Sequence, residues 1–212
     1  VVIDGADLIT FDGNNASALF QVFATKSLTL KRLTLQHGVF NAVHALESFG
    51  NLTLSDVTMK DNVSTDSAIQ ANGGLILIVS STFTGNVISG AGGKGAVLDN
   101  LGASVTIIGS TFSNNGSSTP DSGSGGAIEN DDAGELHVSS STFSGNHALD
   151  GGAIDNHAGI ASISTSTFTN NSAGYGGAIE SFGDQLIVSD SHFIGNTASA
   201  SDGGAISNVR ST

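Results

Sequence analysis

Short alternations of apolar and polar residues recur along the whole chain. The most regular one places an apolar anchor among small polar residues, usually with asparagine three positions later, as in Thr142-Phe143-Ser144-Gly145-Asn146. These anchors recur every 24 to 31 residues, at Phe11, Leu35, Met59, Phe83, Phe112, Phe143, Phe168 and Phe193. Alternation with a period of two is typical of β-strands, and self-similarity at such spacings is typical of repeat arrays. The chain is therefore predicted to consist of repeated β units.

Two further alternating segments accompany each anchor. From the second unit on, an apolar–any–apolar triplet begins seven residues before the anchor, as in Leu136-His137-Val138. A third segment follows, centred on Phe20, Leu46, Ile69, Leu98, Ile128, Ile154, Ile179 and Ile206. Three short strands bury no face alone, but coils of them stack around one core. We predict an all-β fold with one right-handed parallel β-helix domain over residues 1–212, of about eight coils of three strands.

Two units are longer than the others. The extra residues fall between the second and third strands, at 87–95 and at 116–125, and the second stretch contains the only proline, Pro120. The motifs on either side are intact, so we predict adjacent loops that protrude from one edge of the solenoid.

Asparagines and threonines also fall in register. One asparagine column follows the anchors, at Asn14, Asn62, Asn86, Asn115, Asn146, Asn171 and Asn196. A second contains Asn100, Asn130, Asn156 and Asn208, with Ser48 and Ser181 in the same place. Stacked asparagines hydrogen-bond along a column, so structural ladders are favoured over a ligand site.

A rank of threonines precedes the anchors, at Thr10, Thr34, Thr58, Thr82, Thr111, Thr142 and Thr167. Such ranks resemble those of ice-binding β-solenoids. The preference of threonine for half-exposed strands explains the rank equally. This interpretation is favoured because a second rank of hydroxyls just after the anchors is interrupted at Asp12, Gln36, Lys60 and Ile194.

Acidic residues form a further column one position after the third-strand centre, at Glu47, Asp99, Glu129, Asp155 and Glu180, with Gln70 between the first two. Neighbouring carboxylates about 4.8 Å apart repel by roughly 1 kcal/mol in water. A solvated stripe with splayed side chains is favoured. The alternative is weak Ca²⁺ binding by Asp99, Glu129, Asp155 and Glu180, the only metal candidates. No other cofactor is expected.

Charge and residue types narrow the function classes. The net charge is −13 with only six Lys and Arg, which argues against nucleic acid and anionic membranes, and no apolar run approaches twenty residues. Parallel β-helix lyases and hydrolases combine clustered carboxylates with Lys or Arg. The best cluster (Glu129, Asp131, Asp132 and Asp155) has no basic residue nearby in the sequence or in the neighbouring unit. Arg32 and Arg210 lie near opposite ends, and the histidines (37, 44, 137, 147, 157 and 192) share no column. We expect no enzymatic activity; the alternative is polysaccharide binding or cleavage.

The paired motifs resemble a known family. Gly-Gly-Ala-Ile following Phe-x-x-Asn, as at 151–154 after 143–146, resembles the repeats of the chlamydial polymorphic outer-membrane proteins, which are autotransporter passengers and adhesins. The opening segment 3–17 also resembles the first coil of large bacterial surface proteins that carry this repeat. The resemblance implies an extracellular or cell-surface location in bacteria and adhesion to a host or neighbouring-cell surface.

The two end units are expected to contain all three strands without a capping helix. Uncapped coils expose strand edges, and stacking of one end on the other is open-ended. We expect copies of the chain to associate end to end into an extracellular fibre; the competing interpretation is that the chain is a slice of a longer passenger. The expected edge residues are Val1, Val2, Ile3, Leu186, Val188, Phe193, Ala205 and Ile206.

Overall fold

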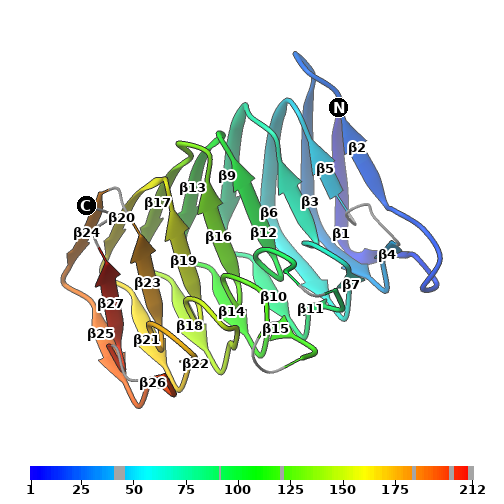
Figure 1. Cartoon of the computed structure of the whole chain (residues 1–212). Helices are drawn as coiled ribbons and strands as arrows, with labels where there is room; N and C mark the ends of the chain where they lie inside the picture. Colours follow the sequence, from blue (N-terminus) through cyan, green and yellow to red (C-terminus); the bar gives the residue numbers. More distant parts are fainter. Residues whose placement is uncertain (41–45, 91, 120–121, 183–184, 201–202, 210–212) are drawn as a thin grey trace.

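The chain folds into a β-solenoid. The computed structural model describes residues 1–40, 46–90, 92–119, 122–182, 185–200 and 203–209, and no helix occurs among them. All paired strands are parallel and belong to successive coils, and the two ends of the chain lie at opposite ends of the stack (Figure 1). The prediction of an all-β parallel β-helix of about eight coils is confirmed.

The third strands of the coils form one sheet of eight. In stacking order it contains β2 (Phe20–Val22), β5 (Leu46–Ser48), β8 (Ile69–Ala71), β12 (Leu98–Leu101), β16 (Ile128–Asp131), β19 (Ile154–His157), β23 (Ile179–Phe182) and β27 (Ile206–Val209). Each predicted centre pairs with its counterpart; Ile128, for example, faces Ile154, which faces Ile179. The alignment of the third strands that the sequence predicted is therefore the pairing register seen in the structure.

The first and second strands share a sheet of 13. They are continuous in β1 (Val2–Asp12), β3 (Ser27–Gln36) and β6 (Asn51–Lys60). From the fourth coil on they are separate. The first strands there are β9 (Leu75–Val79), β13 (Ser104–Ile108), β17 (Glu135–Ser139), β20 (Ile160–Ser164) and β24 (Leu186–Ser189). The second strands are β10 (Thr82–Thr84), β14 (Thr111–Ser113), β18 (Thr142–Ser144), β21 (Thr167–Thr169) and β25 (His192–Ile194).

A serine column explains this break. Ser141 occupies the place that Leu33 and Val57 hold in the continuous strands; its hydroxyl donates to Ser139 O (2.8 Å) and accepts from the Ser110 backbone N–H (3.1 Å). Ser81, Ser110 and Ser166 make equivalent bonds. Because these side chains satisfy backbone groups at a corner, the sheet turns there. The alternation of apolar and polar residues did not predict this serine column.

A fourth short strand begins four residues after the anchor in most coils. These two-residue strands are β4 (Val39–Phe40), β7 (Val63–Ser64), β11 (Val87–Ile88), β15 (Gly116–Ser117), β22 (Ser172–Ala173) and β26 (Thr197–Ala198). We expected only a turn there, because two residues carry no alternation. Stacked turns of equal shape nevertheless pair their backbones. The stretches 87–95 and 116–125 both begin with such a strand, and Pro120 lies outside the described residues.

Aromatic stacking fills the core. The rings of Phe83, Phe112, Phe143, Phe168 and Phe193 stack in sequence, with centroids 4.7–4.8 Å apart and planes within 12° of parallel. All but the last are fully buried beside the aliphatic residues of the other strands. Full burial of such a side chain stabilises the fold by about 1.5–3 kcal/mol.

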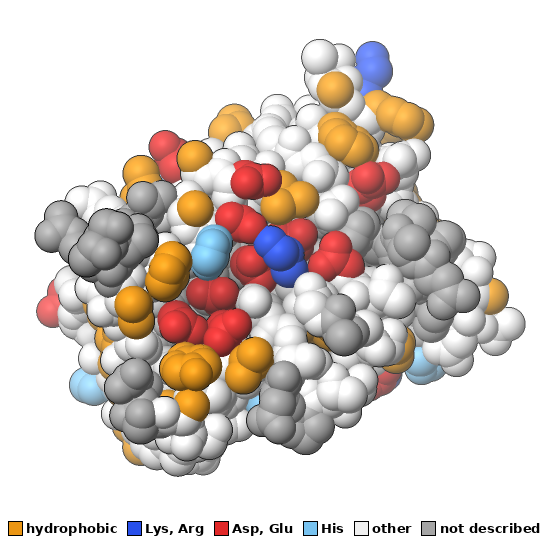
Figure 2. Space-filling view, viewed as in Figure 1, with side chains coloured by type: hydrophobic (Ala, Val, Ile, Leu, Met, Phe, Trp, Pro, Cys, Tyr) orange, Lys and Arg blue, Asp and Glu red, His pale blue; other side chains and the backbone are white. Residues whose placement is uncertain are grey.

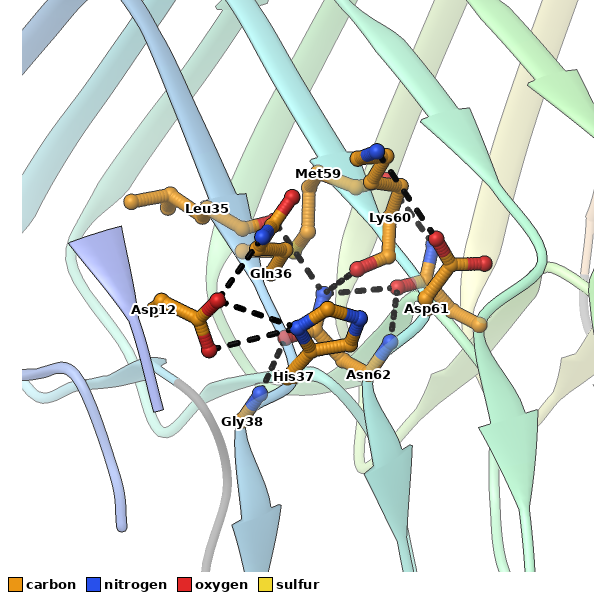
Figure 3. A network of polar contacts seen from close by, with 10 residues as sticks. Asp12, Leu35, Gln36, His37, Gly38, Met59, Lys60, Asp61 and Asn62 are labelled. Atoms are coloured by element: carbon orange, nitrogen blue, oxygen red, sulfur yellow. Dashed lines mark hydrogen bonds and ion pairs between the residues drawn. The ribbon is translucent and has the colours of Figure 1, made fainter. Parts of the chain in front are cut away.

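Both asparagine columns are structural ladders. From Asn62 to Asn196 each amide group donates to the next Asn Oδ1 at 2.8–3.0 Å, and most also donate to an anchor carbonyl one coil back. Figure 3 shows the ladder's N-terminal end, where Asn62 accepts from Gly38 N. Asn14 is an exception to the prediction: its side chain is exposed, and its backbone N–H donates to Asp12 Oδ1. The second ladder runs from Asn100 through Asn130 and Asn156 to Ser181.

Candidate binding groove

The predicted acidic column lies on the outer face of the eight-stranded sheet. Asp99, Glu129, Asp155 and Glu180 (the acid column) stand on β12, β16, β19 and β23, each paired in register with the next. Their neighbours one residue earlier point into the core, so alternation turns these four carboxyls outward. The side-chain direction that the sequence predicted is therefore correct.

The acid column is nevertheless buried. Asp99, Glu129, Asp155 and Glu180 are only 1%, 2%, 4% and 8% exposed, so the prediction of a solvated stripe with splayed side chains is wrong. Each of the four also has one buried carboxylate oxygen that no group in the described part of the chain hydrogen-bonds. Alternation along a strand distinguishes inward from outward residues, but it says nothing about a neighbouring segment that covers the outward ones.

A glycine turn supplies that cover. Gly125, Gly151 and Gly176 have φ of +62°, +55° and +57°, which places the preceding residue of each coil beside the acid column. A Cβ on Gly151 would lie 2.1 Å from Ile154 O, so only glycine fits. The covering residues are Lys94, Ser124, Asp150 and Tyr175 (the turn column), joined by backbone bridges from coil to coil. The Gly-Gly-Ala-Ile motif thus shapes one wall of a groove.

The opposite wall stands two residues beyond each acid. It contains Asp131, His157, Phe182 and Val209, and the rings of His157 and Phe182 stack with centroids 5.3 Å apart. Together with the turn column these residues and three of the acids enclose a cavity of about 580 Å³. Figure 2 shows acidic side chains gathered around a basic one at the centre of this face, with a histidine and hydrophobic side chains beside them.

A lysine occupies the N-terminal half of the groove. Lys94 Nζ lies 3.1 Å from Glu129 Oε1 and 2.5 Å from Asp131 Oδ2. The prediction that the carboxylate cluster has no basic neighbour is therefore wrong. Lys94 lies at the end of the first insertion, and its long stem spans the spacing between coils to reach acids 35 and 37 residues later in the sequence. Asp132, also assigned to that cluster, is exposed and does not line the groove.

Burial and the lysine set the charges there. Burial raises the pKa of Glu129 to about 7, although Lys94 opposes the shift. Burial alone would raise the pKa of Asp131, but the hydrogen bonds from Lys94 and the Asp132 backbone N–H, together with the charge of Lys94, outweigh it, so this pKa is lowered. The pKa of Lys94 is raised, because its bond to Asp131 and the charge of Glu129 outweigh burial. Lys94 and Asp131 are thus charged at neutral pH.

The C-terminal half of the groove has acids without a base. Burial raises the pKa of Asp155 well above its ordinary value, and the neighbouring charges of Glu129 and Glu180 add to the shift. Burial and Asp150, which shares a hydrogen bond with Glu180, raise the pKa of Glu180 to about 7. Apart from Lys94, no Lys or Arg lines the described groove. This half therefore presents hydrogen-bond acceptors that lack donors.

The other candidate residues form no further site in the described ranges. No group of three His, Cys, Asp or Glu side chains in the described ranges is arranged to hold a metal ion, and Ca²⁺ binding by the acid column stays a prediction. The threonine rank does stack in register from Thr58 to Thr167, but ice binding also stays a prediction. His44 and Arg210 lie outside the described residues.

The fold and its ladders define a parallel β-helix repeat protein. The model of the Chlamydia polymorphic membrane protein repeat matches residues 109–131, 140–157, 165–181 and 190–209, so segments of the last four coils are similar to this repeat. Each matched segment spans the second strand and most or all of the third strand of one coil, and the first three contain Glu129, Asp155 and Glu180 of the acid column. No curated protein and no solved structure matches the chain significantly.

These repeats point to a protein of the outer membrane or cell surface. In the described part of the chain, no helix is both long enough and apolar enough to cross a membrane.

Proposed function

We propose that this chain is a non-enzymatic, extracellular adhesive and structural β-solenoid displayed on the bacterial surface. The observation that carries the proposal is the polymorphic membrane protein repeat in the last four coils, because that family is one of surface adhesins. Its adhesive partner is a host or neighbouring-cell surface. Binding of fluorescent chain to host cells, compared with a β-helix of similar charge and no such repeats, tests this part. Equal binding of the two proteins would contradict it.

We further propose that copies associate end to end. The strands of the first coil, β1 and β2, pair on one side only, and so do β24, β25, β26 and β27 at the other end. Val1 and Val2 are exposed. Leu186, Val188, Phe193, Ala205 and Ile206 are more exposed than their counterparts in inner coils, and Ile3 packs only partly against the core. Unpaired parallel edges are templates for another chain, and a head-to-tail contact without closure extends as a filament.

A lysine at position 205 is expected to block this contact. Ala178, the counterpart of Ala205 one coil earlier, is fully buried and leaves no room for a longer side chain. At the open edge a lysine stem can extend outward, so Ala205→Lys folds but rejects an added coil. Light scattering and negative-stain micrographs should show concentration-dependent fibres for the parent chain and monomers for the variant.

Ile108→Lys, on the exposed flank of β13, is the matched control and should assemble like the parent. Monomers of the parent chain at high concentration would overturn end-to-end association. They would also favour the interpretation that further coils of a longer chain cover these edges.

The groove favours a second candidate, polysaccharide binding or cleavage. Buried carboxyls with raised pKa values are the groups that glycoside hydrolases use as general acids. A reducing-sugar assay over acidic polysaccharides tests this function. Activity that Asp155→Ala abolishes and Asp132→Ala preserves would support it, because Asp132 lies outside the groove.

A further inference from the structure

Lys94 shows how the groove accommodates an ammonium group. Its Nζ lies within 3.1 Å of two carboxylates, one from the acid column and one from the opposite wall. The ammonium enters from the turn column, and the carboxylates of Glu129 and Asp131 accept from it. Charge-assisted hydrogen bonds of this kind are among the strongest in proteins.

The next coils repeat the acids without repeating the lysine. Asp155 and Glu180 stand in register with Glu129, but Asp150 and Tyr175 take the place of Lys94 in the turn column. Asp155 Oδ1 and Glu180 Oε2 are buried and have no hydrogen-bond partner in the described structure, and both side chains line the cavity. Buried acceptors without donors are costly, so a donor from outside the chain would be bound favourably.

Aromatic rings lie beside these acceptors. Tyr175 and Phe182 are exposed at the cavity, and His157 stacks on Phe182. Such rings attract organic cations and cover their carbon skeletons. A bare metal ion would use neither ring, and no described carboxyl or histidine group is arranged to hold one.

We propose that the C-terminal half of the groove binds a ligand with a primary ammonium group. Asp155, Glu180 and Asp150 accept its hydrogen bonds, and Phe182 and Tyr175 pack against its carbon skeleton. The ammonium belongs to an amino sugar or to the lysine side chain of a partner protein, which share this chemistry. The inference does not depend on end-to-end association.

Binding should release protons. Free of ligand, Glu180 titrates near pH 7, and Asp155 holds its proton at higher pH than an ordinary carboxyl. The groups that face them are Asp150, Glu129, Asp131, His157 and Tyr175, with Lys94 as the nearest fixed cation. A bound cation favours the ionised carboxylates, so the affinity for a lysine-type amine, which stays protonated over this range, should rise between pH 6 and pH 8.

Matched ligand pairs test the proposal by calorimetry on the 212-residue chain. Glucosamine and Nα-acetyl-lysine represent the two sources, and each has a control whose amine is acetylated. Both amines, or one of them, should bind, and the acetylated controls should not. The amine with the higher affinity identifies whether the natural ammonium group comes from an amino sugar or from a lysine side chain. Equal binding of acetylated and free amines, or binding of Ca²⁺ without either amine, would overturn the proposal.

Two variants locate the ligand. Glu180→Gln keeps the shape and removes the charge, and it should weaken amine binding about tenfold or more, whereas Glu135→Gln on the exposed part of β17 should not. Lys94→Ala should lower the melting temperature and open a second amine-binding site. Added amine should therefore raise the melting temperature of this variant more than that of the parent. Unchanged affinity in Glu180→Gln would contradict the assignment whatever Lys94→Ala does.

Discussion

A carboxyl group that folding takes out of water retains its proton to higher pH. Burial raises the pKa of Asp99 to about 8, with the charge of Asp66 adding to the shift, and the pKa values of Glu129 and Glu180 are about 7. The opposite case is Asp12, which accepts from Gln36 and His37 (Figure 3) and from the backbone N–H of Asn14, and whose pKa is lowered to about 2. The pKa of Asp12 is lowered because it accepts several hydrogen bonds, whereas burial dominates the pKa values of the acid column.

The acid column should make the fold less stable as pH rises. In the unfolded chain these carboxyls ionise near pH 4, whereas in the folded chain Asp99, Glu129 and Glu180 ionise near pH 7–8. Between these limits the folded state binds more protons, so the free energy of unfolding falls from pH 4 to pH 8. Asp99→Asn should raise stability at pH 8 by about 1–3 kcal/mol and change it less at pH 4.5.

Urea unfolding at both pH values provides the measurement. Asp132→Asn serves as the control, because Asp132 is exposed and should leave the profile unchanged. An Asp99→Asn profile parallel to that of the parent would show that Asp99 is ionised throughout.

Within the coil, the glycine turn is the element that joins fold and groove. Gly151 and Gly92 both have positive φ, at +55° and +78°, but a Cβ would meet Ile154 O at 2.1 Å only at Gly151 and has open space at Gly92. Substituting these two glycines therefore distinguishes the cost of a positive φ from the cost of a steric clash.

Gly151→Ala should destabilise the chain by more than 3 kcal/mol, and Gly92→Ala by only about 1–2 kcal/mol, the usual cost of a left-handed residue with a side chain. The measurement is again the free energy of unfolding. Gly151→Ala should also disturb the groove, because the turn positions Asp150 above Asp155. Equal losses in the two variants would show that φ alone sets the cost.

The phenylalanine stack and the asparagine ladders are unevenly distributed along the solenoid. The phenylalanine stack begins at Phe83 and the asparagine ladder at Asn62, so the first two coils contain neither. In a solenoid each coil is stabilised by its own packing and by its neighbours. The central coils, which hold both ladders and the stack, are therefore expected to be the most stable.

Hydrogen exchange should reveal this gradient. Amides of β16, β18 and β19 should exchange slowest, and those of β1 and β2 at least tenfold faster. Phe143→Ala, which interrupts the stack, should accelerate exchange on both sides of β18 while β1 changes little. Uniform protection from β1 to β19 would instead indicate one cooperative unit.

Features that recur with a constant period could be predicted from the sequence. Contacts between a side chain of one coil and groups of the neighbouring coil could not. Phe143 and Ile154 could be placed because each belongs to a column with a constant period. Lys94 could not be assigned to Glu129, since its column holds Ser, Asp and Tyr in the other coils and its partners lie in the next coil. Ser141 resembled a turn residue, because nothing in Ser139-Ser140-Ser141 shows that one hydroxyl satisfies the coil before it.

The turn column has a consequence for how such a protein diversifies. Position 94 holds a lysine and satisfies two acids from within, whereas positions 124, 150 and 175 hold other residues. Because these four coils present the same backbone there, the residue at this one position decides whether the neighbouring acids are neutralised or left for a ligand. Binding stoichiometry would then change in whole-number steps, one coil at a time, without any change in the scaffold.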